Sequence, residues 1–150
     1  MISLVIIDDE PGARETIRNI LEMSSSELNI LGEAGNVEQA HQLILEKDPE
    51  LVLLDINLPD GSGFDLLKRF EKISFKVVFI TAHEEYAIRA FRYSAADYIM
   101  KPLKAGELLD AIERVGEVIE KDQMSLKLNT LLQNLDKLKK LVLKTAESIH

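Results

Sequence analysis

The stretch LVLLDINLPDGSGFDLL, residues 51–67, decides the fold. Its first four residues, 51–54, are apolar and suit a short strand buried on both faces. Residues 58–63 are rich in Pro and Gly and make a turn before an amphipathic stretch begins. The polar residues Asp55 and Asn57 stand directly after the expected strand. A buried strand that ends in a carboxylate and leads into a helix is typical of an α/β sheet with a ligand site at its edge.

Four other short apolar runs repeat this arrangement along the chain. They are residues 2–7, 30–31, 77–80 and 98–100. Amphipathic stretches with helical spacing separate these runs, so strand and helix alternate five times. Alternation with short connections predicts βαβ units, and thus a doubly wound, five-stranded parallel sheet with helices on both faces. Periodicity alone leaves the order of the strands open.

Composition excludes several classes of protein. The chain has 150 residues with 18 Lys+Arg and 26 Asp+Glu, a net charge of −8, which argues against general nucleic-acid binding. It contains no cysteine, so it has no disulfide, thiolate metal site or cysteine nucleophile. No apolar run approaches the roughly 20 residues that span a bilayer, and the first residues lack the basic start of a signal peptide. We therefore expect a cytoplasmic protein with no membrane partner.

The chain changes character near residue 121. Residues 1–120 carry 12 Lys+Arg and 23 Asp+Glu (12 − 23 = −11), whereas residues 121–150 carry six and three (6 − 3 = +3). An apolar seam with steps of 3 and 4 then begins: Leu128, Leu131, Leu135, Leu138 and Val142. This seam fits a helix that packs on its own domain, on a neighbouring molecule, or in a parallel dimer. The run at 141–143 is expected to begin a strand.

Polar side chains follow four of the expected strands. They are Asp8 and Asp9, then Asp55, Thr81 and Lys101. Because the carboxyl ends of parallel strands meet at one edge of a sheet, we expect these groups to lie together. Three clustered carboxylates repel one another and favour a hard divalent cation, and an oxygen-only ligand set suits Mg²⁺. The alternative is that Asp8 or Asp9 only caps the following helix, which explains one of them at most.

A carboxylate beside such a cation can act as a nucleophile on phosphorus. Asp55 is placed for that role, and Lys101 and Thr81 could cover the charge on the transferring phosphoryl oxygens. Taken singly, Lys101 could be a solvated lysine and Thr81 a β-branched strand residue. Their joint occurrence at strand ends favours the chemical interpretation.

Four stretches resemble the receiver domain of two-component response regulators: VIIDDEPGAR (5–14), LVLLDINLPDGSGFDLL (51–67), VVFITAH (77–83) and ADYIMKPL (96–103). The resemblance implies a flavodoxin-like sheet of order 2-1-3-4-5 with a C-terminal linker helix. It implies that a sensor histidine kinase phosphorylates Asp55 and that Thr81 and Lys101 contact the phosphoryl group. It also implies a Mg²⁺ cofactor held by Asp8, Asp9, Asp55 and the backbone carbonyl of Asn57.

The same resemblance implies a switch and a cis peptide bond. Once Asp55 is phosphorylated, Thr81 moves toward the phosphoryl group and Tyr98 leaves an exposed position to fill the vacated space. The bond between Lys101 and Pro102 is expected to be cis.

Two further stretches, HEEYAIRAF (83–91) and SAADY (94–98), resemble receivers that precede a LytTR-type DNA-binding domain. Residues 139–150 are similar to the first strand of that domain. We therefore expect a receiver domain at 1–120, a linker helix at 121–140, and the truncated start of an output domain at 141–150. DNA would be bound only through the missing output domain.

Two copies are expected to pair through the fourth helix, fifth strand and fifth helix, with help from the linker helix. The two helix regions carry opposite charges. The residues concerned are Arg89, Ala90, Arg92 and Tyr93 in the fourth helix region, and Glu107, Asp110, Glu113 and Glu117 on the fifth. One alternative function is a stand-alone receiver or phosphorelay scaffold. The other is a haloacid-dehalogenase-type phosphatase, which usually has a second Asp two residues after its nucleophile, where this chain has Asn57.

Overall fold

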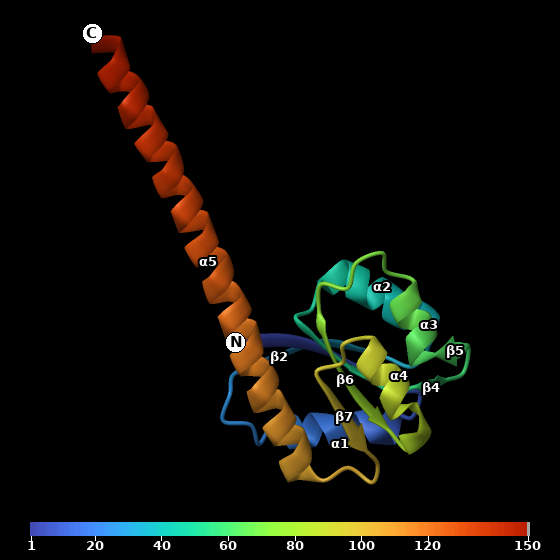
Figure 1. Cartoon of the computed structure of the whole chain (residues 1–150). Helices are drawn as coiled ribbons and strands as arrows, with labels where there is room; N and C mark the ends of the chain where they lie inside the picture. Colours follow the sequence, from blue (N-terminus) through green and yellow to red (C-terminus); the bar gives the residue numbers. More distant parts are fainter. Residues whose placement is uncertain (150) are drawn as a thin grey trace. The chain divides into compact units, whose positions relative to one another are not determined.

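The computed structural model describes the backbone of residues 1–149 and the side chains of residues 1–146. It divides into two compact units, residues 1–115 and residues from 116 onward. The first unit is built on a parallel five-stranded sheet of order β2-β1-β3-β6-β7 (Figure 1). Its strands are β1 (Ile2–Ile7), β2 (Leu28–Ala34), β3 (Leu51–Leu54), β6 (Lys76–Thr81) and β7 (Asp97–Met100). The predicted doubly wound fold and its strand order are confirmed.

Helices cover both faces of the sheet. They are α1 (Pro11–Leu21), α2 (Val37–Lys47), α3 (Gly63–Lys68), α4 (Ala87–Arg92) and the start of α5 (Ala105–Ile149), with a 3₁₀ turn η1 (Glu84–Tyr86) before α4. From β1 the chain first adds β2 at one edge of the sheet, and then adds β3, β6 and β7 in turn on the other side of β1. Because crossovers between parallel strands are right-handed, this change in the side on which strands are added places α1 on one face of the sheet and α2, α3 and α4 on the other (Figure 1).

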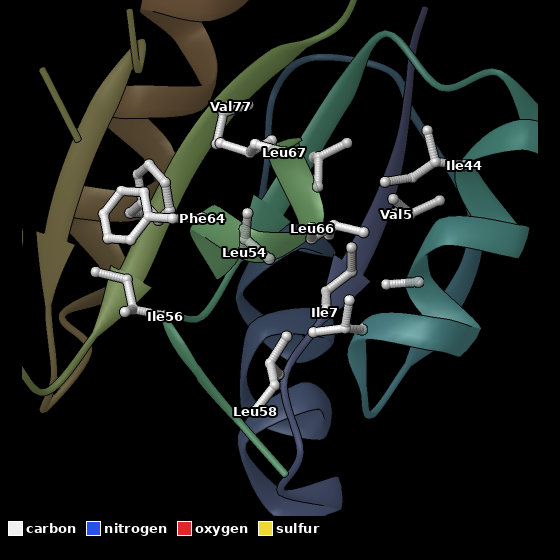
Figure 2. Packing of buried hydrophobic residues seen from close by; sticks show 14 of the residues in the cluster. Val5, Ile7, Ile44, Leu54, Ile56, Leu58, Phe64, Leu66, Leu67 and Val77 are labelled. Atoms are coloured by element: carbon white, nitrogen blue, oxygen red, sulfur yellow. The ribbon is translucent and has the colours of Figure 1, made fainter. Parts of the chain in front are cut away.

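The core between the sheet and α2 to α4 consists of alternate strand residues and the inner faces of the helices. The strands contribute Val5, Ile7 and Leu54, and α3 contributes Phe64 and Leu67 (Figure 2). All five side chains are at most 1% exposed. This close packing holds the strands in register, so the carboxyl ends of β1, β3, β6 and β7 are fixed relative to one another.

A short hairpin follows β3, where the sequence predicts only a turn-rich loop. Its strands are β4 (Asn57–Leu58) and β5 (Gly61–Ser62), paired antiparallel. Gly61 has φ of +155°, a conformation that side chains disfavour and glycine adopts freely. The hairpin begins at Asn57, directly after Ile56, and its second strand leads without a gap into α3.

Helix α5 is longer than the sequence predicts. It runs without a break from Ala105 to Ile149, so the linker helix expected at 121–140 is part of α5. The strand expected at 141–143 is wrong, because these residues are helical. Leu, Lys and Ala favour helix there, and the second unit has no strand within residues 116–149 with which another could pair. His150 lies outside the described residues, and the assignment of 141–150 to an output domain stays a prediction.

The seam predicted on this helix is exposed. Leu128, Leu131, Leu135, Leu138 and Val142 are between 52% and 60% accessible. Within residues 1–149, no helix is long and apolar enough to span a membrane.

An acidic site at the carboxyl edge of the sheet

Three carboxylates meet where β1 and β3 end. Asp8 and Asp9 follow β1, Asp55 follows β3, and these two strands are neighbours in the sheet. One oxygen from each of the three lies within 4.8 Å of the others. Asp8 is 1% exposed and Asp55 7%, whereas Asp9 is exposed. An oxygen-only set of this size and charge fits a hard divalent cation.

Lys101, at the end of β7, reaches the same site. Its Nζ donates to Asp8 Oδ2 at 2.7 Å and to Asp55 Oδ2 at 3.0 Å. Burial alone would lower the pKa of Lys101, but hydrogen bonds with the two carboxylates outweigh burial and raise that pKa. The ammonium group therefore stays charged at neutral pH. The Lys101–Pro102 peptide bond is cis, the isomer that the resemblance implies.

Capping does not explain the acidic pair after β1. The N-cap residue of α1 is Glu10, and its side chain makes no capping hydrogen bond. Asp8 Oδ1 accepts the Glu10 N–H at 3.0 Å while Asp8 Oδ2 faces Lys101. Arg14, which the sequence pattern did not place at this site, donates through Nη1 to the Asp8 carbonyl at 2.6 Å. Hydrogen bonds from the start of α1 therefore hold Asp8 in place at the end of β1.

Thr81 and Tyr98 both contact the loop that follows β6. Thr81 is fully buried, and its Oγ1 accepts the His83 N–H at 3.4 Å. The Tyr98 hydroxyl donates to the His83 carbonyl, and its ring lies 6.1 Å from that of Phe79. Tyr98 is half-buried rather than exposed, contrary to the expectation for an unphosphorylated chain. Burial first, and then the charges of Glu85 and Asp55, raise the pKa of its phenol, which remains a donor.

His83 also reaches the site, through a contact that the sequence pattern did not predict. Its Nε2 contacts the Asn57 side-chain amide, and its Nδ1 lies 3.2 Å from Glu85 Oε1. The Asn57 N–H in turn donates to Asp55 Oδ1 at 3.4 Å. The contact joins residues 26 apart in the chain, so no local spacing could reveal it.

Gly63 makes room for Asp55. A Cβ atom at residue 63 would lie 2.7 Å from the Asp55 carbonyl oxygen and 3.1 Å from Leu54 Cγ. We expect Gly63→Ala to lower the free energy of unfolding by about 1–3 kcal/mol through overpacking, measured by urea denaturation. The control is Gly12→Ala, because a Cβ at exposed Gly12 meets nothing within 4 Å. That change should be neutral or stabilising by up to about 1 kcal/mol. Equal effects of the two changes would contradict this account.

Known proteins with similar sequences and folds are bacterial regulators. The family described as "Response regulator receiver domain" matches residues 4–113. The sensory transduction protein LytR of Staphylococcus epidermidis is 36% identical over 121 residues, which cover 79% of this chain and 48% of LytR. LytT of Bacillus subtilis is 33% identical over 120 residues, 79% of this chain and 49% of LytT. The chain spans about half the length of these relatives.

Solved structures agree with the sequence comparisons. The response regulatory domain of MrkE from Klebsiella pneumoniae superposes with a TM-score of 0.74 at 25% identity, covering 79% of this chain and 98% of that one. A LuxR-family DNA-binding response regulator from Staphylococcus aureus has a TM-score of 0.69 at 27% identity, covering 77% and 98%. From its sequence match over residues 4–113 and its fold, the chain belongs to the response regulator receiver family.

Proposed function

We propose that Asp55 accepts a phosphoryl group from the phosphohistidine of a sensor histidine kinase. The observation that carries this proposal is the pair of buried carboxylates, Asp8 and Asp55, bridged by Lys101 Nζ at 2.7 and 3.0 Å. An Asp55 oxygen forms a bond to phosphorus while the phosphorus–nitrogen bond breaks, and the imidazole leaves as a neutral ring because its other nitrogen carries a proton in the phosphohistidine. Lys101 and the Thr81 hydroxyl are the donors assigned to the phosphoryl oxygens.

The proposed cofactor is Mg²⁺. Asp8, Asp9 and Asp55 supply three carboxylates, and the backbone carbonyl of Asn57 supplies a further oxygen. A bound Mg²⁺ would offset the repulsion between the Asp55 carboxylate and the incoming phosphoryl oxygens. The chain itself provides the buried setting, the orientation of Asp55, and the charge of Lys101. In this role the domain assists its own phosphorylation and dephosphorylation rather than turning over a substrate.

The proposed output is control of transcription. The relatives LytR and LytT are about twice as long as the matched region, which leaves room for a further domain in those proteins. We keep the boundaries expected from the sequence as a proposal: 1–120 for the receiver, 121–140 for a linker, and 141–150 for the start of a LytTR-like output domain that binds DNA, although residues 141–149 are helical rather than extended. We expect a cytosolic location, where the ATP that charges a histidine kinase is available.

Acetyl phosphate tests the phospho-acceptor proposal. With Mg²⁺ present, the intact mass should increase by one phosphoryl group, hydroxylamine should remove that group as it removes other acyl phosphates, and EDTA should prevent the gain. A chain that gains no mass under these conditions is not a phospho-acceptor. Repeated turnover of p-nitrophenyl phosphate would instead favour the haloacid-dehalogenase-type alternative.

We also propose that phosphorylation favours a homodimer through α4, β7 and α5. On α4, Ile88 and Phe91 are 76% and 82% exposed beside Arg92. On α5, Glu107 and Glu113 are exposed, so the two elements offer opposite charges to a two-fold-related copy. Ala90 does not belong to this surface, because it is buried, and Tyr93 is half-buried, with its ring 5.4 Å from that of Phe64.

Beryllofluoride, a phosphoryl mimic, should shift the chain toward a dimer in sedimentation velocity, and Arg92→Glu should weaken that dimer. Lys68→Glu on α3 makes the same charge change elsewhere and should have no effect. A monomer with and without the mimic would refute the dimer. A constitutive dimer that survives Arg92→Glu but not Leu131→Lys with Leu135→Lys would move the interface to the exposed seam of α5.

A further inference from the structure

The hairpin after Asp55 is too small to hold its own shape. Each of its strands has two residues, with Asn57 paired to Ser62 and Leu58 to Gly61. Isolated hairpins are marginal in water even when they are longer. The position of Asn57, which carries the carbonyl assigned to Mg²⁺, therefore depends on what anchors the hairpin.

The base of the hairpin is anchored to α3. Ser62 and Asp65 form a reciprocal capping box, with hydrogen bonds of 2.8 and 3.1 Å. The Gly63 N–H also donates to the Ile56 carbonyl at 2.7 Å. These contacts fix the point where the hairpin returns to the helix, and the tip between Leu58 and Gly61 lies beyond them.

The tip is anchored to α2 through Asp60. Its Oδ1 accepts the Val37 N–H at 2.7 Å and its Oδ2 accepts the Glu38 N–H at 3.1 Å. These are the first two N–H groups of α2, which have no partner inside the helix. Asp60 is exposed to solvent, and a carboxylate that accepts two such bonds at the positive end of a helix makes a directional contact there. The Val37 hydrogen bond is also the main reason why the pKa of Asp60 is low.

We infer that Asp60 is a positioning residue, which ties the hairpin to the start of α2 and so holds the Asn57 carbonyl at the metal site. This inference rests on the proposed Mg²⁺ site. The structure also offers a matched control, because Asn36 caps the same helix end. Its side chain accepts the Gln39 N–H at 2.8 Å, but it belongs to the segment before α2 and not to the hairpin.

The test compares Asp60→Ala with Asn36→Ala in the whole chain. Both changes remove a cap of α2 and should lower the urea midpoint to a similar extent. Only Asp60→Ala should weaken Mg²⁺ binding, by on the order of 10-fold, the lower end of the loss seen for residues that orient metal ligands. NMR shifts of the Asp55 and Asn57 amides report this affinity. Asp60→Asn keeps one acceptor and should lie between Asp60→Ala and the unaltered chain.

Amide hydrogen exchange gives a second readout that needs no metal. Residues 57–62 should exchange faster in Asp60→Ala and not in Asn36→Ala. Equal Mg²⁺ affinity and equal exchange in the two variants would overturn the positioning role. If the unaltered chain binds no Mg²⁺ at millimolar concentration, the proposed function fails instead, and the exchange measurement still decides whether Asp60 holds the hairpin.

Discussion

Asp55→Asn should take up no phosphoryl group from acetyl phosphate, whatever the incubation time, as measured by intact mass. The amide oxygen is a poor nucleophile and cannot form an acyl phosphate. The control is Glu10→Gln, which removes one exposed negative charge beside the site without removing a carboxylate of the cluster. That variant should be phosphorylated as the unaltered chain is. Phosphorylation of Asp55→Asn at the normal rate would place the acceptor on another residue.

The same substitution should separate folding from metal binding. The unaltered chain holds three carboxylates within 4.8 Å of one another, against one ammonium group. Removing one of these charges reduces repulsion, so without Mg²⁺ we expect Asp55→Asn to unfold at an equal or higher temperature. With Mg²⁺ at ten times its Kd, the unaltered chain should gain about 1.4 kcal/mol, and the variant should gain much less. Calorimetry in EDTA and in Mg²⁺ measures both effects.

Lys101→Ala should keep the fold but lose the response to beryllofluoride. Two charge-assisted hydrogen bonds disappear, and Asp8 and Asp55 then face each other without a cation. We expect the free energy of unfolding at pH 7 to fall by about 2 kcal/mol. Chemical-shift changes of Thr81 and Tyr98 on addition of beryllofluoride should be lost, because the assigned phosphate donor on β7 is gone. Lys104→Ala, at a nearby exposed lysine, should match the unaltered chain.

The sign of the pH dependence follows from the raised pKa of Lys101. A group whose pKa is higher in the folded state stabilises the fold below its unfolded pKa, about 10.4, and loses that contribution as pH rises through the folded value. The stability difference between the unaltered chain and Lys101→Ala should therefore be constant near neutrality and shrink only above about pH 10.4. A difference that vanishes near pH 7 would mean that Lys101 does not act through its charge.

Sequence patterns locate the ends of the strands, but they do not locate the contacts between the loops that follow these strands. Buried apolar runs mark β1, β3, β6 and β7, and the chain direction forces their polar end residues to one edge, so the Asp8, Asp55 and Lys101 cluster could be predicted. Contacts between loops follow no periodicity. The His83 contact with Asn57 and the Asp60 contact with α2 depend on loop conformations that only the packed structure defines.

In the linker region, the sequence pattern leaves the secondary structure itself ambiguous. The steps of 3 and 4 after residue 121 correctly indicate helix, but the short apolar run at 141–143 fits helix and strand equally well. Within residues 116–149, helical propensity decides the outcome, because no neighbouring strand is present to reward an extended conformation.

The hydrogen bond between Lys101 and Asp8 joins residues 93 positions apart. Contacts of such long range form late, because the entropy of closing a large loop is lost before the contact contributes. The acidic site therefore lacks its ammonium group in any partly folded chain in which β7 has yet to dock, even where β1 and β3 have already paired. Ligands that bind this site should slow unfolding much more than they speed folding, since their contacts are absent from an early transition state. We therefore expect a phosphoryl group on Asp55 to be held by Lys101 only in chains whose sheet is fully assembled.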